Sequence, residues 1–213
     1  MGVIKYLLFD LDNTLYSRHY GLEDAVYQRI MEFAGAYLGI SPDEARHQRV
    51  TAKVQYGTSL EWLMTEEGFT DVEAFLASVH PPGETAPLVP DGDLRAFLAA
   101  IPIPRAILTN SPREHAVAVL EKLRLRDMFT HIFDIRSNNF IGKPHRESFE
   151  NALHTLGVNA EEVLFIDDYP SYVEGFVAIG GKGLLFDEDD VHKNFPLPRI
   201  RELREIVRHL GGH

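Results

Sequence analysis

Cysteine is absent from this chain of 213 residues. Its absence excludes disulfide bonds, thiolate nucleophiles and zinc sites built on sulfur. Basic residues are scarce, with 21 Lys and Arg against 32 Asp and Glu and a formal net charge of −11. Binding to a nucleic acid polymer requires concentrated positive charge, so we expect no such partner. A small phosphorylated metabolite held in a local basic pocket is compatible with this composition.

Long hydrophobic runs are also missing. No apolar stretch in the sequence approaches the roughly 20 residues that are needed to cross a bilayer. The apolar run in MGVIKYLLFD stops at Asp10 and is too short for the core of a secretion signal. We therefore expect a cytoplasmic protein without a membrane partner. The sequence carries no signal for its oligomeric state.

Short apolar runs typical of buried strands recur along the chain, at residues 3–9, 105–108, 132–135, 163–166 and 183–186. Helical patterns lie between most of these runs. Strands that alternate with helices predict a parallel sheet that is covered on both faces. The expected fold is therefore α/β, with a Rossmann-like parallel sheet at the centre of a three-layer α/β/α core.

Start and stop signals mark several of the helices. Ser111 is expected to cap a helix, with Pro112 in its first turn and Glu114 closing a capping box. Gly157 predicts the end of another helix. The C-terminal stretch PRIRELREIVRHLGG predicts a helix whose apolar face carries Ile200, Leu203, Val207 and Leu210.

The segment from residue 17 to residue 88 interrupts the alternation of strands and helices. It holds a helical apolar stripe (Leu22, Val26, Ile30, Phe33 and Tyr37), a capping box from Ser41 to Glu44, and a short helix in TDVEAFLASVH. The helix that Ser41 opens is expected to end at Gly57. We expect a small helical cap domain over residues 17–88 and a core domain formed by residues 1–16 and 89–213. The alternative is that these helices pack directly on the sheet.

Two pairs of aspartates follow apolar runs: Asp10 and Asp12 follow YLLF, and Asp167 and Asp168 follow VLFI. Ligands of open parallel sheets bind at the carboxyl ends of the strands. Two close carboxylates are tolerated when a cation lies between them or when one is protonated, and oxygen ligands favour hard cations such as Mg²⁺. The ordinary alternative is that these are solvated loop aspartates that cap turns.

Two further positions complete the pattern. Thr109 ends the strand-like run RAILT, and its hydroxyl and the neighbouring Asn110 amide suit a phosphate oxygen beside a helix N-terminus. Lys143 lies in IGKPHRESFE and can neutralise both phosphate and carboxylate. Taken singly, these two positions also fit an ordinary strand-end threonine and a surface lysine.

The order Asp-x-Asp, Thr, Lys, Asp-Asp resembles the four motifs of the haloacid dehalogenase superfamily, and the match spans nearly the whole chain. FDLDNTLY, TNSPREHAVAVLEKL, FDIRSNNFIGKPHRESFENAL and VLFIDDYPS are most similar to its pyrimidine 5′-nucleotidase branch. The resemblance implies that the helical insertion is a C1-type cap. That branch typically continues its acidic pair with Ser and, three residues later, Asn. Here Tyr169 and Tyr172 stand at those positions.

The resemblance implies a phosphatase that works through an aspartyl-phosphate. Asp10 would be the nucleophile, and Asp12 would protonate the leaving group and then activate water. Thr109 and Lys143 would hold the transferring oxygens. Mg²⁺ would be bound by Asp10, the backbone carbonyl of Asp12, Asp167 and Asp168. The substrate would be a small phosphorylated metabolite, with a nucleoside monophosphate among the candidates.

The stretch YGTSLEW follows the second predicted helix of the cap. Tyr56, Thr58 and Ser59 are candidates to contact the substrate, and the alternative is a tight turn whose side chains only pack. Trp62 is expected in the core of the cap. His80, His115 and His145 are expected to be surface or structural residues rather than catalytic ones.

Three other functions fit parts of the pattern. A haloacid dehalogenase uses the same first aspartate but needs neither the second aspartate nor Mg²⁺, so Asp12 favours the phosphatase. A phosphoacceptor receiver module has its acidic pair first and its nucleophile in mid-chain, the reverse of the order seen here. A non-catalytic relative that acts through its surface would not need every motif residue to be present.

Overall fold

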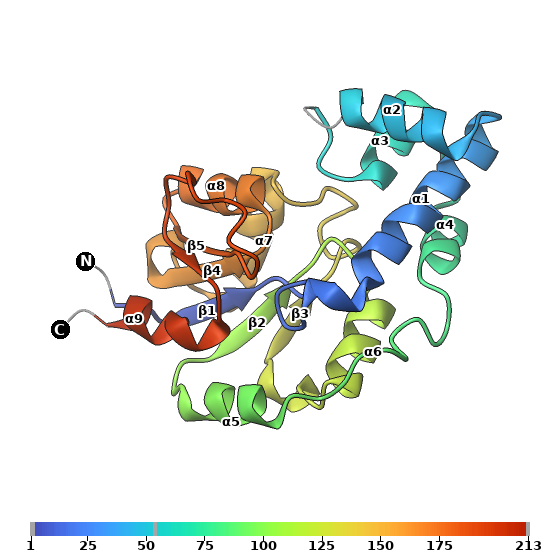
Figure 1. Cartoon of the computed structure of the whole chain (residues 1–213). Helices are drawn as coiled ribbons and strands as arrows, with labels where there is room; N and C mark the ends of the chain where they lie inside the picture. Colours follow the sequence, from blue (N-terminus) through green and yellow to red (C-terminus); the bar gives the residue numbers. More distant parts are fainter. Residues whose placement is uncertain (1–2, 53–54, 212–213) are drawn as a thin grey trace.

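The structure, a computed structural model, describes residues 3–52 and 55–211. Six strands form one sheet in the order β3-β2-β1-β4-β5-β6, and every neighbouring pair is parallel (Figure 1). The strands are β1 (Tyr6–Phe9), β2 (Arg105–Leu108), β3 (His131–Phe133), β4 (Val163–Asp167), β5 (Lys182–Phe186) and β6 (Arg199–Ile200). The predicted parallel α/β sheet is confirmed.

Helices cover both faces of this sheet because side chains along a strand alternate between its faces. Leu7 and Phe9 of β1 join the hydrophobic cluster that contains buried residues of α5 (Gly92–Ala100) and α6 (Arg113–Lys122). Tyr6 and Leu8 join the cluster on the other face, with α7 (Arg146–Leu156) and α8 (Pro170–Ala178). The three layers are therefore helix, sheet and helix.

Four helices are inserted between β1 and α5: α1 (Leu22–Leu38), α2 (Pro42–Ala52), α3 (Ser59–Glu66) and α4 (Val72–Val79). They share a hydrophobic cluster that includes Trp62, Leu63 and Phe75, separate from the two clusters on the sheet. Figure 1 shows these helices grouped beside the sheet rather than layered on it. The insertion thus has a hydrophobic cluster of its own. Ile135, which follows β3, also packs in this cluster.

Short elements complete the chain: the 3-10 turns η1 (Arg18–Tyr20), η2 (Arg126–Met128), η3 (Ala160–Glu162) and η4 (Leu203–Ile206), and the last helix α9 (Val207–Leu210). Among the described helices, none combines the length and the apolar character needed to cross a bilayer.

The predicted C-terminal helix is wrong at its start. Residues 199 and 200 form β6, because the backbone pairs with the edge of β5 through Leu185 N to Pro198 O and Asp187 N to Ile200 O. Helical structure begins only at Leu203, and Val207 is exposed where the expected stripe would bury it. For these two residues, pairing with the open edge of β5 therefore outweighs the helical pattern of the sequence.

Two other helix boundaries differ from expectation. The helix opened by Ser41 has the expected cap, since Glu44 N donates to Ser41 Oγ, but it ends at Ala52 rather than at Gly57. The predicted cap at Ser111 is wrong: α6 begins at Arg113, whose N–H donates to Asp134 Oδ2. Gly157, by contrast, ends α7 with φ +67° as predicted.

Candidate active site

The predicted motif residues meet at the carboxyl edge of the sheet. β1 lies at the centre of the strand order, between β2 and β4. The chain adds β2 and β3 on one side of β1 and β4, β5 and β6 on the other. Ligands bind at such a switch point. Asp10 follows β1, Asp167 ends β4 and Thr109 follows β2, while Lys143 enters from the segment between β3 and α7.

Lys143 is the centre of this cluster. Its Nζ donates to Asp10 Oδ1 and to Asp167 Oδ2, each at 2.6 Å, and its side chain is 1% exposed. The ammonium group also lies over the ring of Tyr172, 5.0 Å from its centroid. Asn110 holds the Lys143 backbone on both sides, since its Oδ1 accepts from Lys143 N at 2.7 Å and its Nδ2 donates to Lys143 O at 3.1 Å. The lysine is therefore a fixed, buried charge and not a surface residue.

Negative charge exceeds positive charge at this point. Oxygens of Asp10, Asp167 and Asp168 lie within 4.8 Å of one another, and Lys143 pairs with two of these residues, Asp10 and Asp167. Burial raises the pKa of Asp10 well above its usual value; Lys143 opposes this rise, and the carboxylates of Asp167 and Asp12 add to it. Burial and the neighbouring Asp167 and Asp10 likewise raise the pKa of Asp168. Three oxygen-donor carboxylates with one ammonium suit a hard divalent cation.

Thr109 and Asn110, the residues expected to bind a phosphate oxygen, both line the cavity. Thr109 is 1% exposed, and its Oγ1 accepts from Ser111 N at 3.0 Å while the residue still lines the pocket. The side chain of Asn110 is engaged with Lys143 and also donates to the Tyr172 hydroxyl at 3.2 Å. Asn110 thus acts through its side chain as a support of Lys143.

Asp12 is held by three donors. Its Oδ1 accepts from the Tyr16 hydroxyl and pairs with His115 Nε2, both at 2.7 Å, and its Oδ2 accepts from Ser111 Oγ at 2.9 Å. Burial opposes ionisation of Asp12, but the charge of His115 and these hydrogen bonds outweigh it and lower the Asp12 pKa. The interaction with Asp12 also explains why Ser111 does not cap α6. The turn after Asp12 is made by Asn13 with φ +55°, a conformation that asparagine tolerates.

His115 was expected to be a surface or structural residue, and the structure places it in direct contact with Asp12. His115 of α6 is buried against Asp12 on one side and pairs with Glu84 Oε1 through Nδ1 at 2.5 Å on the other. Glu84 also pairs with His80 Nδ1 at 2.9 Å and with Arg29 Nη2 of α1. The ligand atoms of His80, Glu84 and His115 lie within 4.8 Å of one another, but they are already engaged in these contacts.

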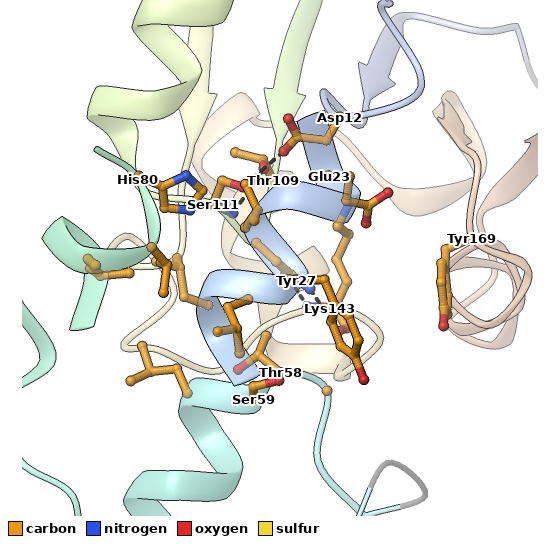
Figure 2. A pocket seen from close by; sticks show the side chains of 18 of the residues that line it. Asp12, Glu23, Tyr27, Thr58, Ser59, His80, Thr109, Ser111, Lys143 and Tyr169 are labelled. Carbon is orange, nitrogen blue, oxygen red and sulfur yellow. Dashed lines mark hydrogen bonds between the residues drawn. The ribbon is translucent and has the colours of Figure 1, made fainter. Parts of the chain in front are cut away.

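A cavity of about 340 Å³ opens between this cluster and the insertion. Figure 2 shows Thr58 and Ser59 on the side of the inserted helices and Asp12, Thr109 and Ser111 on the side of the sheet. The lining also includes Tyr27, Arg49, Tyr169 and Tyr172. Arg49 is 7% exposed, and its Nη1 has no hydrogen-bond partner among the described residues.

Tyr56 does not fit its expected role. It is absent from the described lining of this cavity, it packs in the core of the insertion, and its hydroxyl donates to Glu66. The chain bends at Gly57, and Tyr56 lies in the core of the insertion while Thr58 lines the cavity. Thr58 and Ser59 line the cavity, and Thr58 Oγ1 also caps α3 by accepting from Glu61 N at 3.0 Å.

Two glycines bring the insertion close to Lys143. A Cβ at Gly57 would lie 2.6 Å from the Lys143 carbonyl oxygen, and a Cβ at Gly142 would lie 2.5 Å from Thr58 Cγ2. Real side chains do not tolerate these distances, so each position requires glycine for close approach. Across the same contact, His145 Nε2 lies 3.0 Å from Glu61 Oε1 and accepts from Gly57 N at 3.2 Å. The inserted helices are thus packed against the Lys143 loop.

Comparison with known proteins gives concordant results. A family model described as haloacid dehalogenase-like hydrolase matches residues 4–180. Phosphate metabolism protein 8 of Saccharomyces cerevisiae is 27% identical over 83% of this chain, which spans 59% of that relative. Glyceraldehyde 3-phosphate phosphatase of Methanocaldococcus jannaschii is 25% identical over 98% of this chain and 99% of its own length. A solved HAD phosphatase from Thermococcus onnurineus has a TM-score of 0.65, with 24% identity over 99% of both chains, which supports the fold.

Proposed function

This chain belongs to the haloacid dehalogenase-like hydrolases, and we propose that it hydrolyses phosphomonoesters of small metabolites through an aspartyl-phosphate on Asp10. The observation that carries the proposal is the cluster of Asp10, Lys143 and Asp167 beside Asp12, whose carboxylate is held by Tyr16, His115 and Ser111. A nucleophilic carboxylate, a fixed cation and a separate proton-transfer group are the parts that this chemistry needs.

The donor set fits Mg²⁺. Asp10, Asp167 and Asp168 would hold it through carboxylate oxygens, and Asp12 would contribute its backbone carbonyl. The raised pKa values of Asp10 and Asp168 indicate that further positive charge is favourable there. When bound, the ion would reduce the repulsion between the Asp10 carboxylate and an anionic phosphate.

In the first half of the reaction, an Asp10 oxygen attacks phosphorus and the bond to the leaving oxygen breaks. Asp12 gives its proton to that leaving oxygen. Lys143 and Thr109 hold the phosphoryl oxygens, and Lys143 also stabilises the ionised form of Asp10. The free protein holds Asp12 as a carboxylate, and an arriving phosphate anion would raise its pKa so that it can carry the proton.

In the second half, Asp12 takes a proton from water as the water oxygen attacks the same phosphorus. The bond between phosphorus and the Asp10 oxygen breaks, inorganic phosphate leaves, and the Asp10 carboxylate is restored. The donors that lower the Asp12 pKa are suited to this base step, because they keep the group ionised.

Residues 17–88 would act as the cap domain over the core formed by residues 1–16 and 89–213, and Thr58 and Ser59 would face the part of the substrate that carries the phosphate. The cavity volume and the rings of Tyr27, Tyr169 and Tyr172 favour a ring-bearing leaving group, such as the nucleoside of a nucleoside monophosphate.

The decisive test uses intact-mass measurement after brief exposure to p-nitrophenyl phosphate with Mg²⁺ and an acid quench. Asp12→Asn should accumulate a phosphate adduct, because this ester needs no proton on its leaving group while the later base is gone. Asp10→Asn should show none. An adduct on Asp10→Asn would place the nucleophile elsewhere, and no phosphate release from any ester by the unmodified protein would end the proposal.

A further inference from the structure

The carboxyl group of Asp12 is bound asymmetrically. Oδ1 receives two contacts, from Tyr16 and His115, whereas Oδ2 receives one, from Ser111. Each carboxylate oxygen offers about two acceptor positions. The described residues therefore fill Oδ1 and leave one position on Oδ2. The oxygen that can exchange a proton with a substrate is Oδ2.

His115 has its own support on the opposite edge of its ring. Nδ1 meets Glu84 Oε1 at 2.5 Å, while Nε2 meets Asp12 Oδ1 at 2.7 Å. Because a carboxylate only accepts, both ring nitrogens must donate when both partners are ionised, and the ring is then an imidazolium. The two contacts hold both edges of the buried imidazole ring.

Glu84 is in turn held by Arg29 of the inserted helix α1. Its Oε2 accepts from Arg29 Nη2 of α1, and its Oε1 also pairs with His80. Charges alternate along the row Arg29, Glu84, His115 and Asp12, so each buried charge has opposite neighbours. Such a row resists rotation of any one member, since a rotated group would leave a buried charge unpaired.

We propose that His115, supported by Glu84, is a positioning residue that fixes Asp12 Oδ1 and thereby presents Oδ2 to the leaving oxygen and to the attacking water. This inference rests on the proposed phosphatase function. Without His115, Asp12 keeps its two other donors, Tyr16 and Ser111, but loses the contact that fixes Oδ1. Proton transfer should then suffer, while attack by Asp10 should not.

The test compares two phosphate esters with aromatic leaving groups, p-nitrophenyl phosphate and benzyl phosphate. Nitrophenolate leaves without a proton, whereas the benzyl alcohol oxygen needs one. His115→Gln and Glu84→Gln should lower kcat/KM for benzyl phosphate roughly 10- to 100-fold, less than the 10²–10⁴-fold that full loss of an acid costs. With p-nitrophenyl phosphate the first equivalent of nitrophenol should still appear rapidly, followed by a slower steady rate, because water activation is impaired.

His154→Ala, on the exposed face of α7, is the matched histidine control and should leave both esters and the burst unchanged. Glutamine at residue 115 keeps a donor near Asp12, so His115→Gln should retain more benzyl phosphate activity than His115→Ala. If folded variants lose activity on both esters in equal proportion, or show no burst, the positioning role is wrong. If the unmodified protein hydrolyses neither ester, the proposed function fails first and this inference fails with it.

Discussion

Replacing Lys143 by methionine removes the central charge of the site but keeps nearly the same side-chain length. The Nζ atom lies 2.6 Å from both Asp10 Oδ1 and Asp167 Oδ2. At that separation each pair attracts by about 6 kcal/mol at an effective dielectric constant of about 20, and the desolvation of the buried groups offsets much of this gain. Breaking a buried pair typically costs about 3–5 kcal/mol.

We therefore expect Lys143→Met to lose about 3–5 kcal/mol of unfolding free energy at neutral pH, a large part of the 5–15 kcal/mol of a typical domain. The loss should depend on pH. Burial already raises the pKa of Asp10 and of Asp167, and removal of Lys143 raises both further. Protonated carboxyls need no cation, so the variant is closest to the unmodified protein in acid. It loses stability as pH rises through these raised folded-state values.

The activity of Lys143→Met should fall about 10²–10³-fold, the usual effect of losing one fixed electrostatic group at the reacting atoms. Thermal unfolding between pH 5 and pH 8 and steady-state hydrolysis of p-nitrophenyl phosphate measure the two effects. Lys193→Met is the control, because its side chain is 71% exposed and its loss should change stability by less than about 0.5 kcal/mol. A folded Lys143→Met variant with near-normal rate and unchanged pH dependence would refute the reasoning.

The remaining predictions concern the metal, the cap contact and the cavity. Mg²⁺ should raise the melting temperature and restore activity lost to a chelator, and Asp168→Asn should reduce the shift; full activity after metal removal would contradict the assigned site. Gly57→Ala places a Cβ 2.6 Å from the Lys143 carbonyl oxygen. It should lower the free energy of unfolding by about 1–3 kcal/mol and also lower kcat/KM. Gly92→Ala, whose Cβ would have nothing within 4 Å, is the control for both measurements. Arg49→Met should change the ranking of esters by leaving group in a substrate panel more than it changes p-nitrophenyl phosphate turnover, and equal losses on every ester would assign Arg49 a purely structural role.

The sequence by itself determined five of the six strands and the placement of the principal motif residues. Alternating apolar runs and helix signals are local, so they predict the parallel strands without knowledge of contacts. Because parallel strands end at one edge, the positions of Asp10, Thr109 and Asp167 after three such runs were enough to place them together. Lys143 was a candidate from its sequence context and gained a role from the motif resemblance, but no local pattern indicates its burial.

Only the tertiary structure decided the environment of Asp12. His115 lies 103 residues from Asp12 and 31 from Glu84 in sequence, so no spacing rule connects them. Ser111 has a good local capping signal, but its hydroxyl bonds to Asp12, 99 residues away.

Side-chain direction and edge pairing were also decided by long-range contacts. Tyr56 and Thr58 are near neighbours in a segment expected to contact the substrate. Tyr56, however, packs in the core of the insertion and donates its hydroxyl hydrogen to Glu66, whereas Thr58 lines the cavity. Ile200 fits a helical stripe, yet its backbone completes the sheet edge beside β5. Local patterns describe what a segment can form alone, and the available partners decide which of these forms has the lower free energy.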